Sequence, residues 1–251
     1  MNNIISFIKC GIKAGTLTAC LFISPAVAHA AKSISLLSPD KHIQVSIQLG
    51  DTLSFSITRD RALVLAKSTV FLEFSNTKYA SVGLAPRLKS KEYKKIAEQI
   101  DAPFYRCSQF VSACNELNLK LQNGGVIFRA YNEGVAYRFY TNSKEEVIIK
   151  NEGADYHFPK DYTAYLPYST NDRKPMAMAY QNTYDVAPLS KAQQKLAFLP
   201  VTVDEGNGLK VTLLESDLEN YPGMFVKSDT LKTNLKGVFA PYPAKTDFYP
   251  W

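Results

Sequence analysis

The sequence predicts an all-β protein built as a large antiparallel sandwich. The main observation is a two-residue alternation of apolar and polar side chains, the period of half-buried strands. Glycine and asparagine separate the alternating segments, as in turns between antiparallel strands. Helical patterning is confined to Ser190–Leu196, about two turns. Many strands and almost no helix favour a sandwich over an α/β fold.

The predicted strands follow one another along most of the chain. In the first, Ile43, Val45, Ile47 and Leu49 alternate with polar residues, and in the second Leu53, Phe55 and Ile57 do the same. The same pattern recurs at 117–121, 126–130, 135–139 and 209–213, and more weakly at 201–203. No internal repeat or domain boundary interrupts them, so residues 31–251 are expected to form one domain.

The first thirty residues are predicted to be a signal peptide. Lys9 and Lys13 make a basic start, residues 14–27 carry no charge, and Ala28-His29-Ala30 is a small-x-small cleavage site. Leu17-Thr18-Ala19-Cys20 suggests a lipoprotein site instead, but only six residues separate Lys13 from Cys20. Cleavage after Ala30 and a periplasmic or secreted location are expected. The uncharged run is shorter than the ~20 residues that span a bilayer, so no membrane span is expected.

The charge pattern gives no indication of a nucleic-acid partner. The whole chain has a formal net charge of +6, and the predicted signal removes two lysines and no acid. The densest basic patch, between Arg87 and Lys95, is interpreted as a solvated loop whose lysines deter aggregation between strand edges. No nucleic-acid role is predicted.

Two cysteines, Cys107 and Cys114, remain after the predicted signal. In an oxidising compartment two cysteines this close in sequence most simply form a local disulfide, which we predict here. Two thiols without a nearby histidine fall short of the four ligands of a structural zinc site.

Two longer motifs carry more information than the strand pattern. In Phe128–Phe139 (FRAYNEGVAYRF) two alternating segments meet at Asn-Glu-Gly, where Gly134 can adopt positive φ and close a hairpin. In Leu214–Phe225 (LESDLENYPGMF) a strand runs into an acidic segment and a Tyr-Pro-Gly turn. This places Glu215 at a strand end beside irregular backbone, where functional groups tend to lie.

Together these motifs resemble the amino-terminal β-sandwich of glycoside hydrolase family 97. Further matching segments are Asn115-Glu116-Leu117, Tyr180 to Tyr184, Pro188-Leu189-Ser190 and Phe239 to Pro243, so the resemblance covers roughly residues 33 to 245. It implies a β-supersandwich, the architecture also found in galactose mutarotase-like proteins. The family's members are α-glucosidases and α-galactosidases that join this sandwich to a (β/α)8 barrel with most of the catalytic carboxylates.

The resemblance also implies a role for Glu215. In the family a calcium ion beside the substrate is held mostly by barrel carboxylates, with one glutamate reaching in from the sandwich, and Glu215 matches it. Residues after Leu235 lack the strand-helix repeat of a barrel of about 250 residues, so no catalytic residue is expected in this chain. The expected function is therefore the amino-terminal domain of a calcium-dependent, exo-acting α-glycosidase acting on α-linked oligosaccharides or glycosides, inactive alone and completed by a missing barrel.

Two other functions stay open from the sequence. Residues 162–195 interleave Tyr165, Tyr168, Tyr180 and Tyr184 with amide and charged groups, which suits pyranose rings, so a stand-alone exported carbohydrate-binding module is the main alternative. The same tyrosines could instead pack the loop on the sandwich or against a barrel. A mutarotase-like enzyme would need a clustered acid and base, and only His42 and His157 follow the signal.

Overall fold

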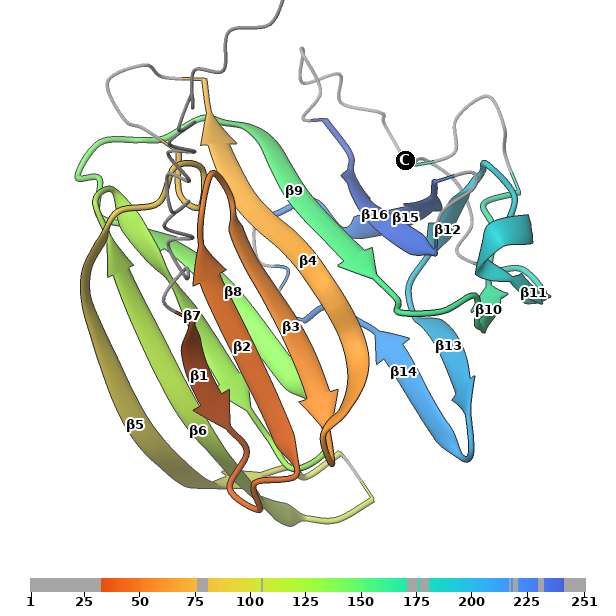
Figure 1. Ribbon diagram of the computed structural model, residues 1–251, viewed down its shortest axis with the longest axis horizontal. Coiled ribbons are helices and arrows are strands. Elements are labelled where there is room, and N and C mark those ends of the chain that lie inside the picture. Colours follow the sequence, from red (N-terminus) through yellow and green to blue (C-terminus); the bar gives the residue numbers. More distant parts are fainter. Residues whose placement is uncertain are drawn as a thin grey trace, which may run out of the picture. The chain divides into compact units, whose positions relative to one another are not determined.

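The computed structural model describes residues 33–75, 81–104, 106–170, 176, 181–216, 218, 221–229 and 233–241. Most of these residues lie in antiparallel strands that form three sheets (Figure 1). The predicted signal peptide and its cleavage site lie outside the described residues. Among the described residues, no helix is long and apolar enough to cross a membrane. The predicted all-β, antiparallel sandwich is confirmed.

The largest sheet has eight strands, and its order departs from the chain order in its second half. The first four strands are joined by short turns, after which β9 pairs with β4 and the carboxy-terminal strands add to β9. In spatial order they are β1 (Ile34–Leu37), β2 (Ile43–Leu49), β3 (Leu53–Arg59), β4 (Ala62–Phe74), β9 (Ile149–His157), β16 (Asn234–Phe239), β15 (Met224–Ser228) and β12 (Leu196–Phe198).

Two four-stranded sheets complete the sandwich. The first contains β5 (Leu88–Asp101), β6 (Gln109–Leu121), β7 (Gly124–Ala130) and β8 (Val135–Thr141) in chain order. The second has the order β11 (Asp185–Pro188), β10 (Thr163–Leu166), β13 (Val201–Gly206) and β14 (Leu209–Leu213). Strand β1 contacts β6 and β7, and β2 contacts β7, so the first small sheet packs on the first half of the large sheet.

One continuous hydrophobic core joins the three sheets. Val45 and Ile47 of β2 are fully buried, which confirms the predicted alternation. Phe55 of β3 meets Phe128 of β7 with ring centroids 5.7 Å apart. The core continues through residues of β9, β10, β13, β15 and β16. Because these buried residues form a single cluster, the sandwich has one core rather than two separate ones.

One local prediction is wrong, and another is confirmed with a different backbone conformation. Ser190–Leu196 does not form two helical turns: a single 3-10 turn covers Leu189–Lys191, and β12 begins at Leu196. Pairing of Leu196–Phe198 with β15 supplies hydrogen bonds that a short isolated helix could not keep. The hairpin at 131–134 forms, with the Tyr131 N–H donating to the Gly134 carbonyl at 2.8 Å, but Gly134 does not have positive φ.

The basic patch between Arg87 and Lys95 belongs to a strand rather than a loop. Lys89 to Lys95 lie in the first half of β5, an edge strand that pairs with β6 alone among the described strands. Lys89, Lys91, Lys94 and Lys95 are exposed along this edge. Charged side chains on an edge oppose pairing with another chain, as predicted from the sequence.

The predicted disulfide between Cys107 and Cys114 is absent from the structure. Both cysteines are free thiols: Cys107 is exposed ahead of β6, and Cys114 is buried within it. Extended backbone from residue 109 to residue 114 spans about 16 Å, whereas a disulfide needs Cα atoms within about 7 Å. The pairing of Cys114 with Ile96 in the β5–β6 ladder holds this strand extended, so the predicted bridge is wrong.

Candidate functional site

Two half-buried carboxylates, Glu152 and Glu215, lie close enough for their charges to interact, although 63 positions separate them in the sequence. Glu152 is on β9, and Glu215 follows the end of β14. Neither forms an ion pair with another of the residues that the structure describes. Carboxylates sheltered from water without a cation are unfavourable, which makes this place a candidate functional site.

The Glu215 carboxylate is held by the backbone of the segment that follows it. The N–H of Met224, the first residue of β15, donates to both carboxylate oxygens, at 2.9 Å to Oε1 and 2.8 Å to Oε2. Gly223 makes the approach possible, because a Cβ at that position would lie 3.3 Å from Oε1. The bend from β14 back to β15 thus fixes Glu215 through a charge-assisted hydrogen bond.

Glu152 occupies an inward position of β9. It alternates with Ala154 and Tyr156, both buried, and lies opposite buried Leu72 of β4. An acidic residue on the core side of a strand contradicts the usual alternation and needs a partner. The hydroxyl of Tyr221 supplies it by donating a short hydrogen bond to Oε2.

A chain of polar side chains continues from this site into the sandwich. The hydroxyls of Tyr137 on β8 and Tyr156 on β9 are 3.2 Å apart, and the Tyr156 hydroxyl lies 3.9 Å from the sulfur of Met224. Tyr137 belongs to the Phe128–Phe139 motif, and Tyr221 and Met224 belong to the Leu214–Phe225 motif. The fold therefore brings the two motifs together through side chains between the sheets.

The surroundings raise the pKa of each of these acidic groups. Burial raises the pKa of the Glu152 carboxyl; the hydrogen bond from Tyr221 lowers it, and the charge of Glu215 raises it. Burial also raises the pKa of Glu215, against the hydrogen bond from Met224. Burial raises the pKa of Tyr156 to about 12 and that of Tyr137 well above its usual value. The tyrosines are therefore hydrogen-bonding groups and not bases at neutral pH.

The donor set fits calcium only as part of a larger site. Calcium takes six to eight oxygen ligands, and carboxylates are the donors it prefers. The described residues contain no group of three or more histidine, cysteine or acidic side chains able to hold a metal ion. Glu215 keeps carboxylate lone pairs free beside its bonds to Met224, so it could supply one ligand while other oxygens come from elsewhere.

The tyrosines of the segment 162–195 have different surroundings. Tyr168 is buried, and its hydroxyl accepts a hydrogen bond from the Gln193 N–H at 2.8 Å, so it packs the segment on the sandwich. Tyr184 is exposed, and Tyr165 is half-buried on β10. Tyr180 lies outside the described residues. Of the four tyrosines considered for contact with pyranose rings, Tyr165 and Tyr184 are therefore the accessible ones among the described residues.

The segment Asn115-Glu116-Leu117 and the Phe128–Phe139 motif meet in an ion pair on adjacent strands. Arg129 Nε donates to Glu116 Oε2 at 2.8 Å, and the Glu116 side chain is only 10% exposed. The hydrogen bond that Arg129 donates to Glu116 raises the pKa of Arg129 further above its usual value. This carboxylate is neutralised by its partner, so its role is structural.

The two histidines do not form an acid and base pair. His42 precedes β2, is exposed, and contacts Asp60, which raises its pKa. His157 ends β9 opposite Asn234 of β16, and its N–H donates to the Ser68 hydroxyl at 3.0 Å. Because each histidine has its own neighbours in a different part of the large sheet, the structure offers no support for mutarotase-like chemistry at these residues.

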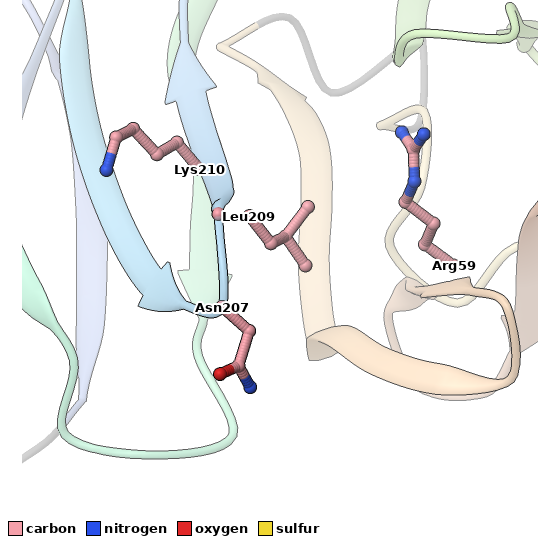
Figure 2. A pocket seen from close by; sticks show the side chains of 5 residues that line it. Arg59, Asn207, Leu209 and Lys210 are labelled. Atoms are coloured by element: carbon pink, nitrogen blue, oxygen red, sulfur yellow. The ribbon is translucent and has the colours of Figure 1, made fainter.

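A shallow pocket elsewhere does not have the chemistry of a glycosidase site. Arg59 at the end of β3 and the β13–β14 turn line it, with Asn207, Gly208, Leu209 and Lys210 on the turn side. Figure 2 shows Leu209 directed toward Arg59, whereas Lys210 extends away from it. The lining holds cationic and amide groups and no carboxylate. The pair of carboxylates that a glycosidase needs is therefore not found here.

The sequence points to Glu215 as a candidate, but it does not indicate Glu152 and Tyr221 as neighbouring side chains. The signal for Glu152 is present in the spacing Glu152-x-Ala154-x-Tyr156-x-Phe158, which puts a carboxylate on an otherwise inward-facing stripe. For Tyr221 the sequence predicts only a turn, because nothing local indicates that its hydroxyl reaches a strand 69 positions away.

Comparisons with known proteins identify the family and the fold of the chain. The family profile "Glycosyl-hydrolase 97 N-terminal" matches residues 36–251. A "Retaining alpha-galactosidase" of Bacteroides thetaiotaomicron is 37% identical over 224 residues, which are 86% of this chain and 34% of that protein. The chain thus spans about a third of the length of this curated relative.

Solved structures show the same fold. A glycoside hydrolase family 97 enzyme in complex with acarbose, from Pseudoalteromonas sp. strain K8, has a TM-score of 0.70 at 20% identity, over 83% of this chain and 32% of that one. A structure described as a beta-arabinopyranosidase has a TM-score of 0.70 at 21% identity, over 84% and 36% of the two chains. With the profile match over nearly all of the described residues, this chain belongs to the N-terminal domain family of glycoside hydrolase family 97.

Proposed function

We propose that this chain is the amino-terminal domain of an exported, calcium-dependent, exo-acting α-glycosidase, in which Glu215 is a calcium ligand. The observation that carries the proposal is the Glu215 carboxylate, oriented by the Met224 N–H and left without a cation among the described residues. Calcium would supply the missing positive charge beside the substrate. The remaining ligands and the catalytic carboxylates would come from a (β/α)8 barrel, so the chain alone would not hydrolyse glycosides.

The surface around Glu215 supports completion by further protein. Leu214 and Leu218 flank it in sequence and are 69% and 46% exposed. Large apolar side chains exposed beside a sheltered carboxylate are typical of a face that another structure covers. The length of the alpha-galactosidase relative, of which this chain matches 34%, agrees with such a partner.

The test is a fusion of residues 31–251 to the remaining part of a family 97 enzyme. Glu215→Gln keeps the size of the side chain and removes its charge, so calcium-dependent release of p-nitrophenol from aryl α-galactosides and α-glucosides should fall by about 100-fold or more. Glu205→Gln is the matched control, because Glu205 is also a half-buried glutamate with a raised pKa but lies on β13. Unchanged calcium dependence in the Glu215→Gln fusion would refute the ligand role.

Carbohydrate binding by the sandwich alone is the second candidate function. Tyr165, Thr202 and Thr212 share the outward face of the second small sheet, and the two threonine hydroxyls are 3.0 Å apart. An aromatic ring beside a row of hydroxyls suits a pyranose. Binding of α-linked oligosaccharides to the chain, followed by calorimetry, should weaken in Tyr165→Ala, whereas the same affinity in both proteins would exclude this face. Tyr93→Ala on the β5 edge is the control.

A further inference from the structure

Tyr221 joins the segment before β15 to two strands of the large sheet. Its hydroxyl donates to Glu152 Oε2 on β9, and its ring meets the Phe239 ring of β16 edge to face, with centroids 6.3 Å apart and planes at 74°. The hydroxyl contact is directional and charge-assisted, and the ring contact fixes the plane of the tyrosine. Residue 221 is therefore held at both ends of its side chain.

The backbone leads directly from this anchor to the donor that orients Glu215. Only Pro222 and Gly223 separate Tyr221 from Met224, and the proline ring fixes its own φ. The position of the Met224 N–H relative to Glu215 thus depends on where Tyr221 is held. Gly223 leaves little spare room, because an added Cβ would be 3.3 Å from the carboxylate oxygen.

We infer that Glu152 and Tyr221 are positioning residues for Glu215. Glu152 holds the Tyr221 hydroxyl, Tyr221 sets the place of residues 222–224, and the Met224 N–H then aligns the Glu215 carboxylate. This arrangement explains why a carboxylate occupies an inward position on β9, where an apolar residue would otherwise be expected. The functional meaning rests on the proposed calcium-ligand role of Glu215, whereas the contacts themselves do not require calcium.

The Met224 amide is a direct reporter of the alignment. The chain has four methionines, so selective 15N-methionine labelling gives few signals, and Met224→Leu identifies the one from residue 224. An amide that donates to a carboxylate resonates downfield and exchanges slowly with solvent. Glu215→Gln removes the charge of the acceptor, so it should move this signal and confirm what the reporter measures.

The variants separate positioning from general stabilisation. Tyr221→Phe and Glu152→Leu should move the Met224 signal and speed its exchange about five- to tenfold, as for the loss of one hydrogen bond. Glu152→Gln keeps an acceptor for the Tyr221 hydroxyl and should retain the parent signal. Tyr140→Phe is the matched control, because it removes a tyrosine hydroxyl that donates to Asn118 at 2.9 Å in the β5–β8 sheet.

The outcomes distinguish this inference from the proposed function. A Met224 signal unchanged in Tyr221→Phe, or moved equally by Tyr140→Phe, would overturn the positioning role. The positioning role would be established if the Met224 amide signal moves and exchanges faster with solvent in Tyr221→Phe and Glu152→Leu. Neither change should occur in Glu152→Gln or Tyr140→Phe. These measurements use the chain without metal or substrate, so an unchanged calcium dependence in the Glu215→Gln fusion would refute the ligand role alone.

Discussion

Glu116 and Glu152 are both acidic residues on strands of the sandwich, but their surroundings differ in one respect. Glu116 on β6 is paired with Arg129 on β7 at 2.8 Å. Glu152 on β9 faces a tyrosine hydroxyl and a second carboxylate, Glu215. The first charge is neutralised within the fold, and the second pair keeps an electrostatic cost. A fold that retains such a cost marks a place for function, whereas the neutralised pair serves stability.

Breaking the neutralised pair should give the largest effect. Arg129→Met keeps the aliphatic packing but leaves the buried Glu116 carboxylate without its partner. The free energy of unfolding should fall by about 2–3 kcal/mol, less than for a fully buried pair because Arg129 is partly exposed. Urea denaturation measures the change, and Glu116→Gln combined with Arg129→Met should recover part of it. A loss below about 0.5 kcal/mol would place this pair among ordinary surface ion pairs.

Cysteine labelling should report the loss of stability in Arg129→Met locally, as opening of strand β6. Cys114 lies two residues before Glu116 on the same face of β6 and is buried, whereas Cys107 is exposed. Cys107 should react at once with a thiol reagent, and Cys114 only when β6 opens. Arg129→Met should speed Cys114 labelling roughly 30- to 150-fold, in proportion to the lost stability. Mass spectrometry counts the modified thiols, and folded protein that resists alkylation at both sites would instead support a disulfide.

Replacing Glu152 or Glu215, the two carboxylates without a cation, should stabilise the protein, the opposite of the effect of Arg129→Met. Glu152→Gln removes one of two interacting negative charges and keeps an acceptor for Tyr221, so unfolding should cost about 0.5 kcal/mol more than in the parent. Glu215→Gln should act in the same direction and less strongly, because solvent screens this half-exposed group. Urea midpoints measured beside those of Arg129→Met test the contrast. Destabilisation by both glutamine variants would show that these carboxylates stabilise the sandwich.

The pH dependence of stability should report the acids whose pKa is raised by burial. Glu205 on β13 has its pKa raised to about 7 by burial, and its Oε1 atom is buried without a hydrogen bond among the described residues. Between its ordinary value and about 7 the folded chain binds more protons than the unfolded chain, so stability rises as the pH falls through 7. Raised pKa values at Glu152 and Glu215 act in the same direction.

The expected size is small because Glu205 is only half-buried. The melting temperature should be higher at pH 5.5 than at pH 8 by roughly 1–3 °C, and Glu205→Gln should reduce the difference. The raised pKa of exposed His42 has the same sign, so the comparison of variant with parent isolates Glu205. Aspartates with lowered pKa, such as Asp161, lose their contribution at lower pH, outside this window. Equal slopes in the two proteins would contradict the raised pKa of Glu205.

The sequence by itself determined the fold class and the strands with clear alternation. Ile43–Leu49 and Leu53–Arg59 appear as predicted, because a two-residue apolar period has one stable solution, a sheet with one face buried. It also singled out Glu215, through a motif that resembles a family. Strand β5 has almost no buried residue, so no period indicated it; its long ladder with β6 holds it in place.

Only the tertiary structure decided that Glu152 and Glu215 lie close together and that Cys107 and Cys114 do not. Register along β9 turns Glu152 inward, and the bend before β15 brings Tyr221 and Glu215 to it. No local pattern encodes these contacts, because they depend on pairing between strands far apart in the chain. The same dependence overturned the disulfide: Cys107 and Cys114 are near in sequence, but ladder pairing keeps the backbone between them extended. Non-local hydrogen bonding thus determines the site, while local side-chain periodicity determines the sandwich.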